Sequence, residues 1–132
     1  MANNYQQFST VIPHNGITER RDWLLAELAK ENGDGYAPNT YSDDKDAVWV
    51  YAEECGDIGA LVEIVAAYQK RFHLTEPWVL TWADWCDKLR VDEFSGGAVA
   101  VLKGTVKWIH PSQLADAWIK KQQRRKPRRK AA

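Results

Sequence analysis

The segment from residue 58 to residue 72 most constrains the fold of this chain, because its apolar side chains recur with the period of an α-helix. They follow the i, i+3, i+4, i+7 spacing with few lapses, at Ile58, Leu61, Val62, Val65, Tyr68 and Phe72. This spacing places them on one face of a helix. Asp57 directly precedes the segment, and its carboxylate is suited to accept hydrogen bonds from the first helical turn. The segment therefore predicts a capped helix that buries one side.

The surface that buries this helix is predicted to be a β-sheet, because β-type segments flank it on both sides. Residues 48–53 and residues 78–84 are rich in β-branched and aromatic side chains. An earlier segment of this type covers residues 8–13. Further along, residues 98–102 and 105–109 predict a hairpin that turns at Lys103-Gly104.

Three other segments complete the expected order. Residues 18–31 carry apolar positions on one helical face, and Pro111 suits the first turn of a final helix that runs into the C-terminal tail. The polar residues 32–46 are interpreted as loop, with room for a short strand at residues 36–41. This predicted order of strands and helices favours a single α+β domain over residues 1–119.

Within this class, two layouts fit the predicted order of elements. A mixed or antiparallel sheet with two helices on one face, ferredoxin-like in outline, fits best. An antiparallel sheet with the first helix packed elsewhere is the alternative. At 132 residues and 45% hydrophobic composition, the chain has enough apolar surface for such a core.

Charge divides the chain at Ile119. All eighteen Asp and Glu residues precede Ile119, with ten of the eighteen Lys and Arg residues, so residues 1–119 carry a net charge of −8. The other eight basic residues give the tail, residues 120–132, a charge of +8: Lys120, Lys121, Arg124, Arg125, Lys126, Arg128, Arg129 and Lys130. A disordered tail of this kind favours salt-sensitive contact with nucleic acid. The alternatives are a solvated terminus and contact with the acidic body.

Acidic residues of the body concentrate between Glu31 and Asp57, where eight carboxylates accompany a single basic residue, Lys45. Hard cations such as Ca²⁺ bind oxygen ligands, but the spacing of an EF-hand loop is missing. A solvated acidic face is therefore favoured over a metal site. A surface that binds a basic partner or imitates the charge of nucleic acid is a third hypothesis, less favoured than the solvated face and more favoured than the metal site.

Tryptophan is unusually abundant, with seven residues in the chain. Five of them lie on or beside predicted strands: Trp49, Trp78, Trp82, Trp85 and Trp108. Core packing is the simpler interpretation, because helices must cover at least one face of the sheet. If both faces are aromatic, the uncovered face is expected to bind a partner.

No catalytic or cofactor-binding pattern is recognised, so we expect neither enzyme activity nor a cofactor. Cys55 and Cys86 lack the spacing of a zinc site and are expected to be reduced in a cytoplasmic setting. Basic neighbours of Cys86 favour its thiolate, whereas neighbouring Asp residues oppose it. No apolar run of about 18 residues occurs, so no membrane span is expected.

Several short motifs occur together in this chain: residues 48–51 before Gly56-Asp57, Arg71-Phe72, residues 78–83, Cys86 with Lys88 and Arg90, and Phe94-Ser95-Gly96-Gly97-Ala98. Over roughly residues 5–109 they resemble a family of small uncharacterised proteins encoded by tailed bacteriophages and prophages. In that family Ser-Lys-Pro-Arg usually follows the cysteine and three glycines precede the alanine. This chain departs at Asp87, Leu89 and Ser95. The resemblance implies a phage setting and no assigned activity.

From these observations we predict a phage-encoded, non-enzymatic accessory protein that binds a host macromolecule in the bacterial cytoplasm, such as a counter-defence (anti-CRISPR-like) inhibitor. The residues predicted to contact the partner combine acidic and aromatic side chains with a glycine-containing loop: Glu53, Glu54, Asp57, Trp82, Trp85, Arg90, Asp92 and Glu93. The alternative is a nucleic-acid-associated protein that binds DNA or RNA non-specifically through the basic tail. A Cys86-dependent or metal-dependent enzyme is less favoured.

Overall fold

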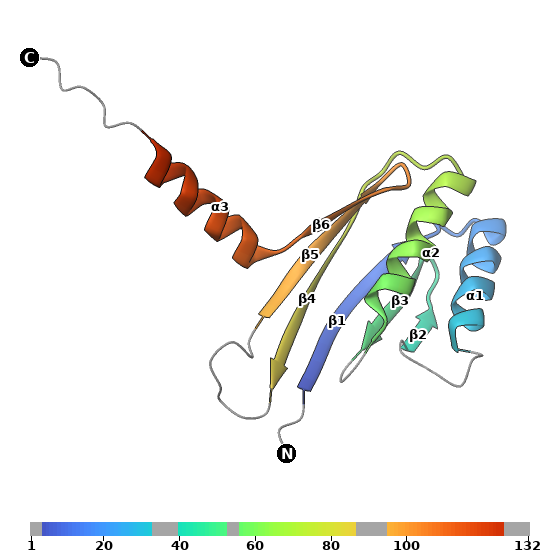
Figure 1. Cartoon of the computed structure of the whole chain (residues 1–132). Helices are drawn as coiled ribbons and strands as arrows, with labels where there is room; N and C mark the ends of the chain where they lie inside the picture. Colours follow the sequence, from blue (N-terminus) through green and yellow to red (C-terminus); the bar gives the residue numbers. More distant parts are fainter. Residues whose placement is uncertain (1–3, 33–39, 53–55, 87–94, 126–132) are drawn as a thin grey trace, which may run out of the picture.

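The computed structural model describes residues 4–32, 40–52, 56–86 and 95–125, which form a β-sheet with helices between and after its strands (Figure 1). The elements, in chain order, are β1 (Asn4–Pro13), α1 (Thr18–Asn32), β2 (Thr40–Asp43), β3 (Ala47–Ala52), α2 (Ile58–Arg71), β4 (Trp78–Cys86), β5 (Ser95–Leu102), β6 (Thr105–Ile109) and α3 (Pro111–Arg124). The strands form one six-stranded sheet. The predicted α+β class is therefore confirmed.

Strand β1 lies inside this sheet, whose order is β2-β3-β1-β4-β5-β6 with antiparallel neighbours throughout. The C-terminal half of β1 pairs with β3, from Phe8 to Pro13, and its N-terminal half pairs with β4, from Asn4 to Gln7. Helix α1 connects β1 to β2 and helix α2 connects β3 to β4. In both connections a third strand separates the two strands that the helix joins.

The core forms where α1 and α2 pack against each other and against the sheet. Helix α1 also contacts β3, and α2 also contacts β5 and β6. Successive side chains of a strand point to opposite faces, so in β3 Val48 and Val50 are buried whereas Trp49 is exposed. The buried apolar side chains are Phe8, Ile12, Leu24, Leu28, Val48, Val50, Ala52, Ile58, Leu61, Val62, Ile64, Val65, Tyr68, Trp78, Leu80, Val99 and Val101.

Helix α2 agrees with the prediction from its apolar stripe. The stripe residues from Ile58 to Tyr68 are buried, and Phe72, which follows the helix, packs partly buried against the core. Asp57 is the N-cap, as predicted, and its side chain accepts a hydrogen bond from the Ala60 amide at 3.0 Å. The cap satisfies one of the amides that a helix start leaves without an intrahelical partner.

The predicted hairpin of β5 and β6 is also confirmed. Its turn residues Lys103 and Gly104 have φ angles of 51° and 80°, and two positive φ angles are typical of the type I′ turns that join antiparallel strands. The buried side chain of Gln69 holds this turn against α2. Its Nε2 donates to the carbonyl oxygen of Val101 at 3.0 Å, and its Oε1 accepts from the Gly104 amide at 2.9 Å.

The largest differences from the predicted strand bounds are in β1 and β2. Strand β1 begins at Asn4 instead of Phe8, because its first four residues pair with β4. Strand β2 covers Thr40–Asp43, whereas the short strand was expected at residues 36–41, of which 36–39 lie outside the described residues. The polar sequence of β2 is a weak strand signal, and pairing with β3 determines its position.

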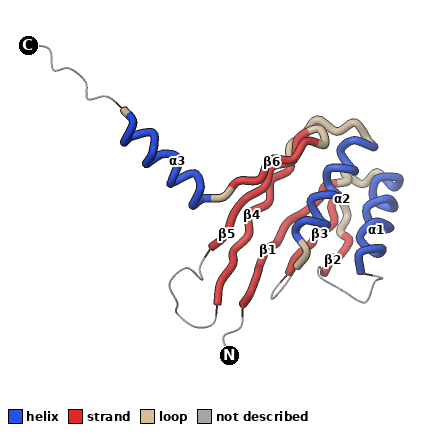
Figure 2. The backbone as a smooth tube through the Cα atoms, in the orientation of Figure 1, coloured by secondary structure: helices blue, strands red, loops and turns tan. Residues whose placement is uncertain are grey.

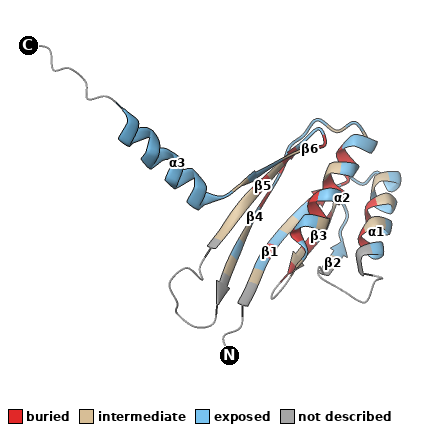
Figure 3. Ribbon diagram, viewed as in Figure 1, coloured by how far each residue is buried: buried red, intermediate tan, exposed pale blue. Residues whose placement is uncertain are grey.

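Helix α3 leaves the end of β6 and projects away from the sheet (Figure 2). Pro111 occupies its first turn, as predicted, and none of its residues is buried (Figure 3). The helix runs through Lys120 to Arg124, so the basic tail begins as helix. None of the helices in the described part of the chain is long and apolar enough to cross a membrane.

Candidate partner-binding surfaces

The sheet has a second face, opposite the core, that presents large apolar side chains to solvent. We call it the open sheet face and define it by Val11, Trp49, Tyr51, Val79 and Leu102, which come from β1, β3, β4 and β5. Val11, Val79 and Leu102 are 54%, 58% and 47% exposed, and Trp49 is 43% exposed. The strand register keeps these side chains on one side: Val11 lies opposite Trp49, and Val79 lies opposite Ala100. The described part of the chain therefore leaves these apolar side chains of the sheet exposed.

The indole of Trp49 is held in place on this face. Its ring stacks on Tyr51 with a centroid distance of 4.1 Å and an interplanar angle of 26°. Its Nε1 donates to the hydroxyl oxygen of Ser9 on the neighbouring strand at 2.7 Å. Two contacts that fix an exposed aromatic ring lower the conformational entropy that a partner would have to remove on binding.

The open sheet face is almost free of charge. The strand register adds small or hydroxyl-bearing residues to it, including Thr81, Ala98 and Ala100. Lys107, opposite Ala100 in the register, is its one charged side chain among the described residues. Among the residues that the structure describes, no acidic side chain therefore extends onto this surface.

A second aromatic group lies on the opposite face of the sheet, on β4 and the end of β6, where Trp108 and His110 are exposed and Trp82 is partly buried against the core. We call it the aromatic shelf and define it by Trp82, Trp108 and His110. The Trp82 ring lies 5.8 Å from the Trp108 ring and 6.4 Å from the His110 ring, both in edge-to-face geometry. A Cβ added to Gly97 would approach the Trp82 ring to 2.5 Å, so glycine is required there for the ring to lie flat over β5. Trp82 Nε1 donates to Asp84 Oδ2 at 3.2 Å.

The basic residues of the tail that the structure describes project with α3. Lys120, Lys121, Arg124 and Arg125 are exposed, and they form no ion pair with any described residue. The acidic body does not neutralise them at Asp43, whose carboxylate binds Arg21 and His14 instead. The other four basic residues, Lys126, Arg128, Arg129 and Lys130, lie outside the described residues.

The contacts of Asp43 form a chain of side chains that fixes the start of α1 to β2. The buried His14 accepts from the Gly16 amide through Nδ1 and faces Asp43 Oδ1 through Nε2, both at 3.1 Å. Because Nδ1 accepts, Nε2 carries the proton and donates to the carboxylate. The Arg21 guanidinium, hydrogen-bonded to Asp43 Oδ2, lowers the pKa of that carboxyl below its ordinary value.

The sequence analysis did not predict these contacts between His14, Asp43 and Arg21. His14 and Asp43 are 29 residues apart, and neither belongs to a motif. Only their positions at strand ends that meet across the sheet, with Pro13 opposite Ala47, hint at the contact. The described residues contain no group of three or more His, Cys, Asp or Glu side chains that could hold a metal ion.

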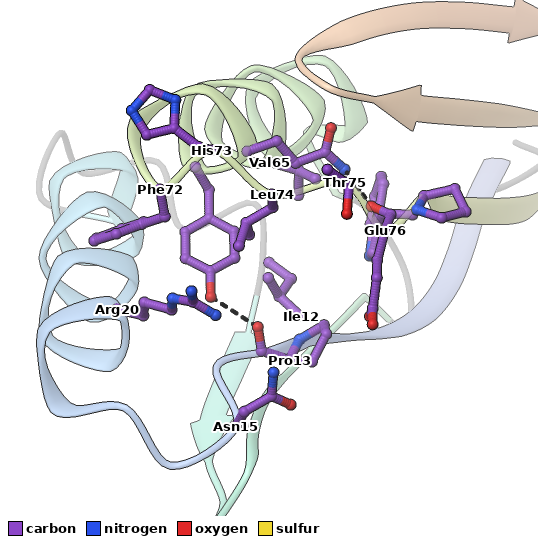
Figure 4. A pocket seen from close by; sticks show the side chains of 14 residues that line it. Ile12, Pro13, Asn15, Arg20, Val65, Phe72, His73, Leu74, Thr75 and Glu76 are labelled. Atoms are coloured by element: carbon purple, nitrogen blue, oxygen red, sulfur yellow. Dashed lines mark hydrogen bonds between the residues drawn. The ribbon is translucent and has the colours of Figure 1, made fainter.

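A pocket of about 290 Å³ opens beside α2, where β1 and β4 diverge (Figure 4). Two β1 carbonyls there accept from side chains: Val11 from Trp78 Nε1 at 3.1 Å, and Pro13 from the Tyr68 hydroxyl at 2.8 Å. Burial raises the pKa of that hydroxyl, an effect that the charge of Arg20 opposes. Arg20 extends into the pocket in Figure 4 and lies 5.9 Å from the centroid of the Phe72 ring.

The residues predicted to bind a partner fall into three groups. Asp57 is described and caps α2, so it has a structural role. Trp82 is described and belongs to the aromatic shelf, whereas only the backbone of Trp85 is described, in β4. The remaining predicted residues, Glu53, Glu54, Arg90, Asp92 and Glu93, lie outside the described residues. The open sheet face adds side chains that the prediction had not selected.

Comparisons of this chain with protein-family models, with curated proteins and with solved structures found no match.

Proposed function

We propose that this protein is a non-enzymatic binding protein that docks on another protein through its open sheet face. The observation that carries the proposal is the exposure of Val11, Trp49, Val79 and Leu102 on the same face of the sheet. Exposed apolar patches on folded domains usually mark interaction sites. A rigid aromatic group at one side, Trp49 stacked on Tyr51, is the kind of anchor that contributes much of the binding free energy in protein interfaces.

The chemistry of this face selects a protein over a nucleic acid as the partner. Contacts to the phosphate backbone dominate nucleic-acid affinity and require several Lys or Arg residues. The open sheet face supplies only Lys107 among its described residues. An uncharged, apolar surface of a partner protein matches the open sheet face. Binding then removes apolar side chains of both proteins from contact with water.

The strand order supports a more detailed description of the fold. For β1 to β4 the order is β2-β3-β1-β4, with a helix between β1 and β2 and another between β3 and β4. We infer from this order the ferredoxin-like outline with both helices on one face. In that arrangement no element of β1 to β4 is left to cover the other face, which explains why apolar side chains remain exposed there.

The resemblance to phage-encoded proteins supports a bacterial host protein as the partner. A component of a defence complex is the target that we propose, with the protein acting as a counter-defence inhibitor in the host cytoplasm. The predicted contact residues Glu53, Glu54, Arg90, Asp92 and Glu93 then contribute electrostatic steering of the encounter with the partner. Steering of this kind increases the rate of association more than the final affinity.

Affinity capture from a bacterial lysate tests the proposal with three forms of the protein. Val79→Glu places a charge on the open sheet face, and Ala67→Glu places the same charge on an exposed position of α2. We expect a captured protein that is retained by wild type and Ala67→Glu and lost with Val79→Glu. The purified partner should then bind Val79→Glu at least about tenfold more weakly, since burying an unpaired charge costs more than 1.4 kcal/mol. A partner that all three forms capture equally would refute this function.

A second candidate function rests on α3. Its four described basic residues are exposed and unpaired with described carboxylates, so they are available to phosphates. We propose non-specific binding of DNA or RNA through this helix and the tail. Replacing Lys120, Lys121, Arg124 and Arg125 by Gln should reduce both the affinity for a DNA duplex and the dependence of affinity on salt. A control variant replaces two basic residues outside α3, Lys103 and Lys107, by Gln, and should change affinity and salt dependence far less. Equal affinity and equal salt dependence in all forms would exclude this candidate.

A further inference from the structure

Helix α3 is amphipathic but has no partner within the described chain. Leu114, Trp118 and Ile119 lie on one side of it and are 59%, 63% and 45% exposed. The basic residues Lys120 and Arg124 lie on the other side, since residues four apart share a helix face, whereas Lys121, three residues after Trp118, lies at the edge of the apolar side. A helix of 14 residues is marginal in water by itself, and helices in proteins gain most of their stability from a packed apolar face. The apolar side of α3 therefore requires a surface to cover it.

The hinge before α3 prevents the helix from folding back on its own sheet. A single residue, His110, separates the end of β6 from Pro111. Its φ and ψ angles are −112° and 114°, in the extended region to which a following proline restricts a residue. One extended residue continues the direction of β6 and cannot reverse the chain. Figure 1 shows the result, with α3 directed away from the body.

The chain also carries a matching surface. The aromatic shelf lies beside the root of α3, and its Trp108 is 41% exposed. Trp82 and Trp108 are held in edge-to-face contact and offer a preformed aromatic platform. The shelf and the apolar side of α3 lack charged residues at their centres, so each can bury the other without an unpaired charge.

We propose that two copies of this protein form a symmetric dimer in which α3 of each copy packs its apolar side on the aromatic shelf of the other. A two-fold axis beside the hinge gives each copy one donated helix and one received helix, so that the interface is closed and self-complementary. The short hinge makes exchange with a second copy the available way to cover α3, as in domain swapping.

The area and the charge fit a dimer. Exchange covers the exposed parts of Trp108, Leu114, Trp118 and Ile119 in both copies, so each copy contributes a helix face and a shelf to the interface. These residues supply part of the roughly 800 Å² per partner of a standard interface, and their neighbours on α3 and β6 supply the remainder. Residues 1–119 carry a net charge of −8 and the tail carries +8, so exchange brings each basic helix to an acidic body. The basic side of α3 stays exposed, which leaves it available for the nucleic-acid contacts considered above.

Sedimentation equilibrium on the full chain, from low to high micromolar concentration, tests the dimer with matched Trp→Glu variants. Trp118→Glu alters the apolar side of α3 and Trp108→Glu alters the shelf, whereas Trp49→Glu places the same change on the open sheet face. We expect wild type and Trp49→Glu to dimerise. The other two should raise the dissociation constant by about thirtyfold or more, as for a central interface tryptophan. Far-UV circular dichroism and thermal melting verify that each variant folds.

A hinge variant provides an independent test that does not alter the interface. Inserting Gly-Gly-Ser between His110 and Pro111 frees the hinge, so α3 can reach the shelf of its own copy. We expect this variant to be monomeric at concentrations where wild type is dimeric. A wild type that is monomeric at every concentration would overturn the proposal. A wild type that dimerises only when DNA is added would also overturn it. So would a dimer that all the variants leave unchanged. Capture of a host protein by the open sheet face is a separate result, because Trp49→Glu affects that function alone.

Discussion

Helices α2 and α3 have the same length, 14 residues each, and opposite environments. Helix α2 buries seven side chains against the sheet and α1, whereas α3 buries none. Both have an apolar side, and both carry basic residues in the last turn. The two helices differ in the surface that they contact. Helix α2 packs against the sheet, whereas α3 follows β6 after one extended residue and projects away from the sheet. An apolar face in the sequence therefore predicts that a helix needs a partner surface, but not that the surface belongs to the same molecule.

The largest expected difference concerns matched leucines in the two helices. Leu61 of α2 is fully buried and Leu114 of α3 is 59% exposed. We expect Leu61→Ala to lower the free energy of unfolding by about 2–5 kcal/mol, because it removes core contacts and leaves a cavity. At low protein concentration Leu114→Ala should change it by less than about 0.5 kcal/mol. Urea denaturation measures both, and equal losses would show that α3 packs on the body.

A matched pair of glutamines sharpens the same comparison. Gln69 is buried in α2 and satisfies the Val101 carbonyl and the Gly104 amide, while Gln122 is exposed on α3. Gln69→Ala leaves both backbone groups without that partner, and we expect a loss of about 1–3 kcal/mol. Gln122→Ala should have almost no effect on unfolding by urea. A Gln69→Ala variant as stable as wild type would mean that water replaces the amide.

The helix starts also differ. Asp57 caps α2 through the Ala60 amide, whereas His110 makes no side-chain cap bond to α3. We expect Asp57→Ala to lower the stability to unfolding by about 1 kcal/mol, while Asp57→Asn keeps most of it, because asparagine is an equally good N-cap. Thermal unfolding of the two variants measures the difference. Equal destabilisation by both would assign the effect to the charge of Asp57.

The smallest expected effect concerns α1, which an ion pair attaches to β2. The pKa of Asp43 is lowered in the folded state, chiefly by Arg21. This stabilisation is therefore complete above the pKa of the unfolded state, about 3.9, and is lost as the pH falls toward the folded value. We expect wild type to lose more stability than Asp43→Asn in this acidic range. Urea unfolding at a series of pH values checks it, and parallel curves would contradict the prediction.

Elements with strong local signals were predictable from the sequence. The stripe of α2, its Asp57 cap and the Lys103-Gly104 turn each depend on residues close together in the chain, and all three were predicted. Strand β2 was poorly placed, because its pairing with β3 determines its bounds and its residues are polar.

The surfaces were predictable only in part. The alternation of Trp78, Leu80 and Trp82 with Val79 and its neighbours showed that both faces of the sheet carry apolar side chains. It did not show which of the two faces is buried, because that depends on the connections in three dimensions. The contact between His14 and Asp43 gave no signal, since it joins residues 29 positions apart. The partner residues chosen for their charge lie mostly outside the described residues, so those choices remain predictions.

The hydrogen bonds of Gln69 also have a mechanical consequence. They clamp the β5–β6 turn to α2, and β6 leads directly into α3, so the orientation of this outer helix is set from inside the core. Helix α3 is about 21 Å long at 1.5 Å per residue. A tilt of the hairpin by about 10° would move its far end by about 4 Å, by simple leverage over that length. Changes that loosen the packing around Gln69 should therefore be amplified at the basic end of the molecule.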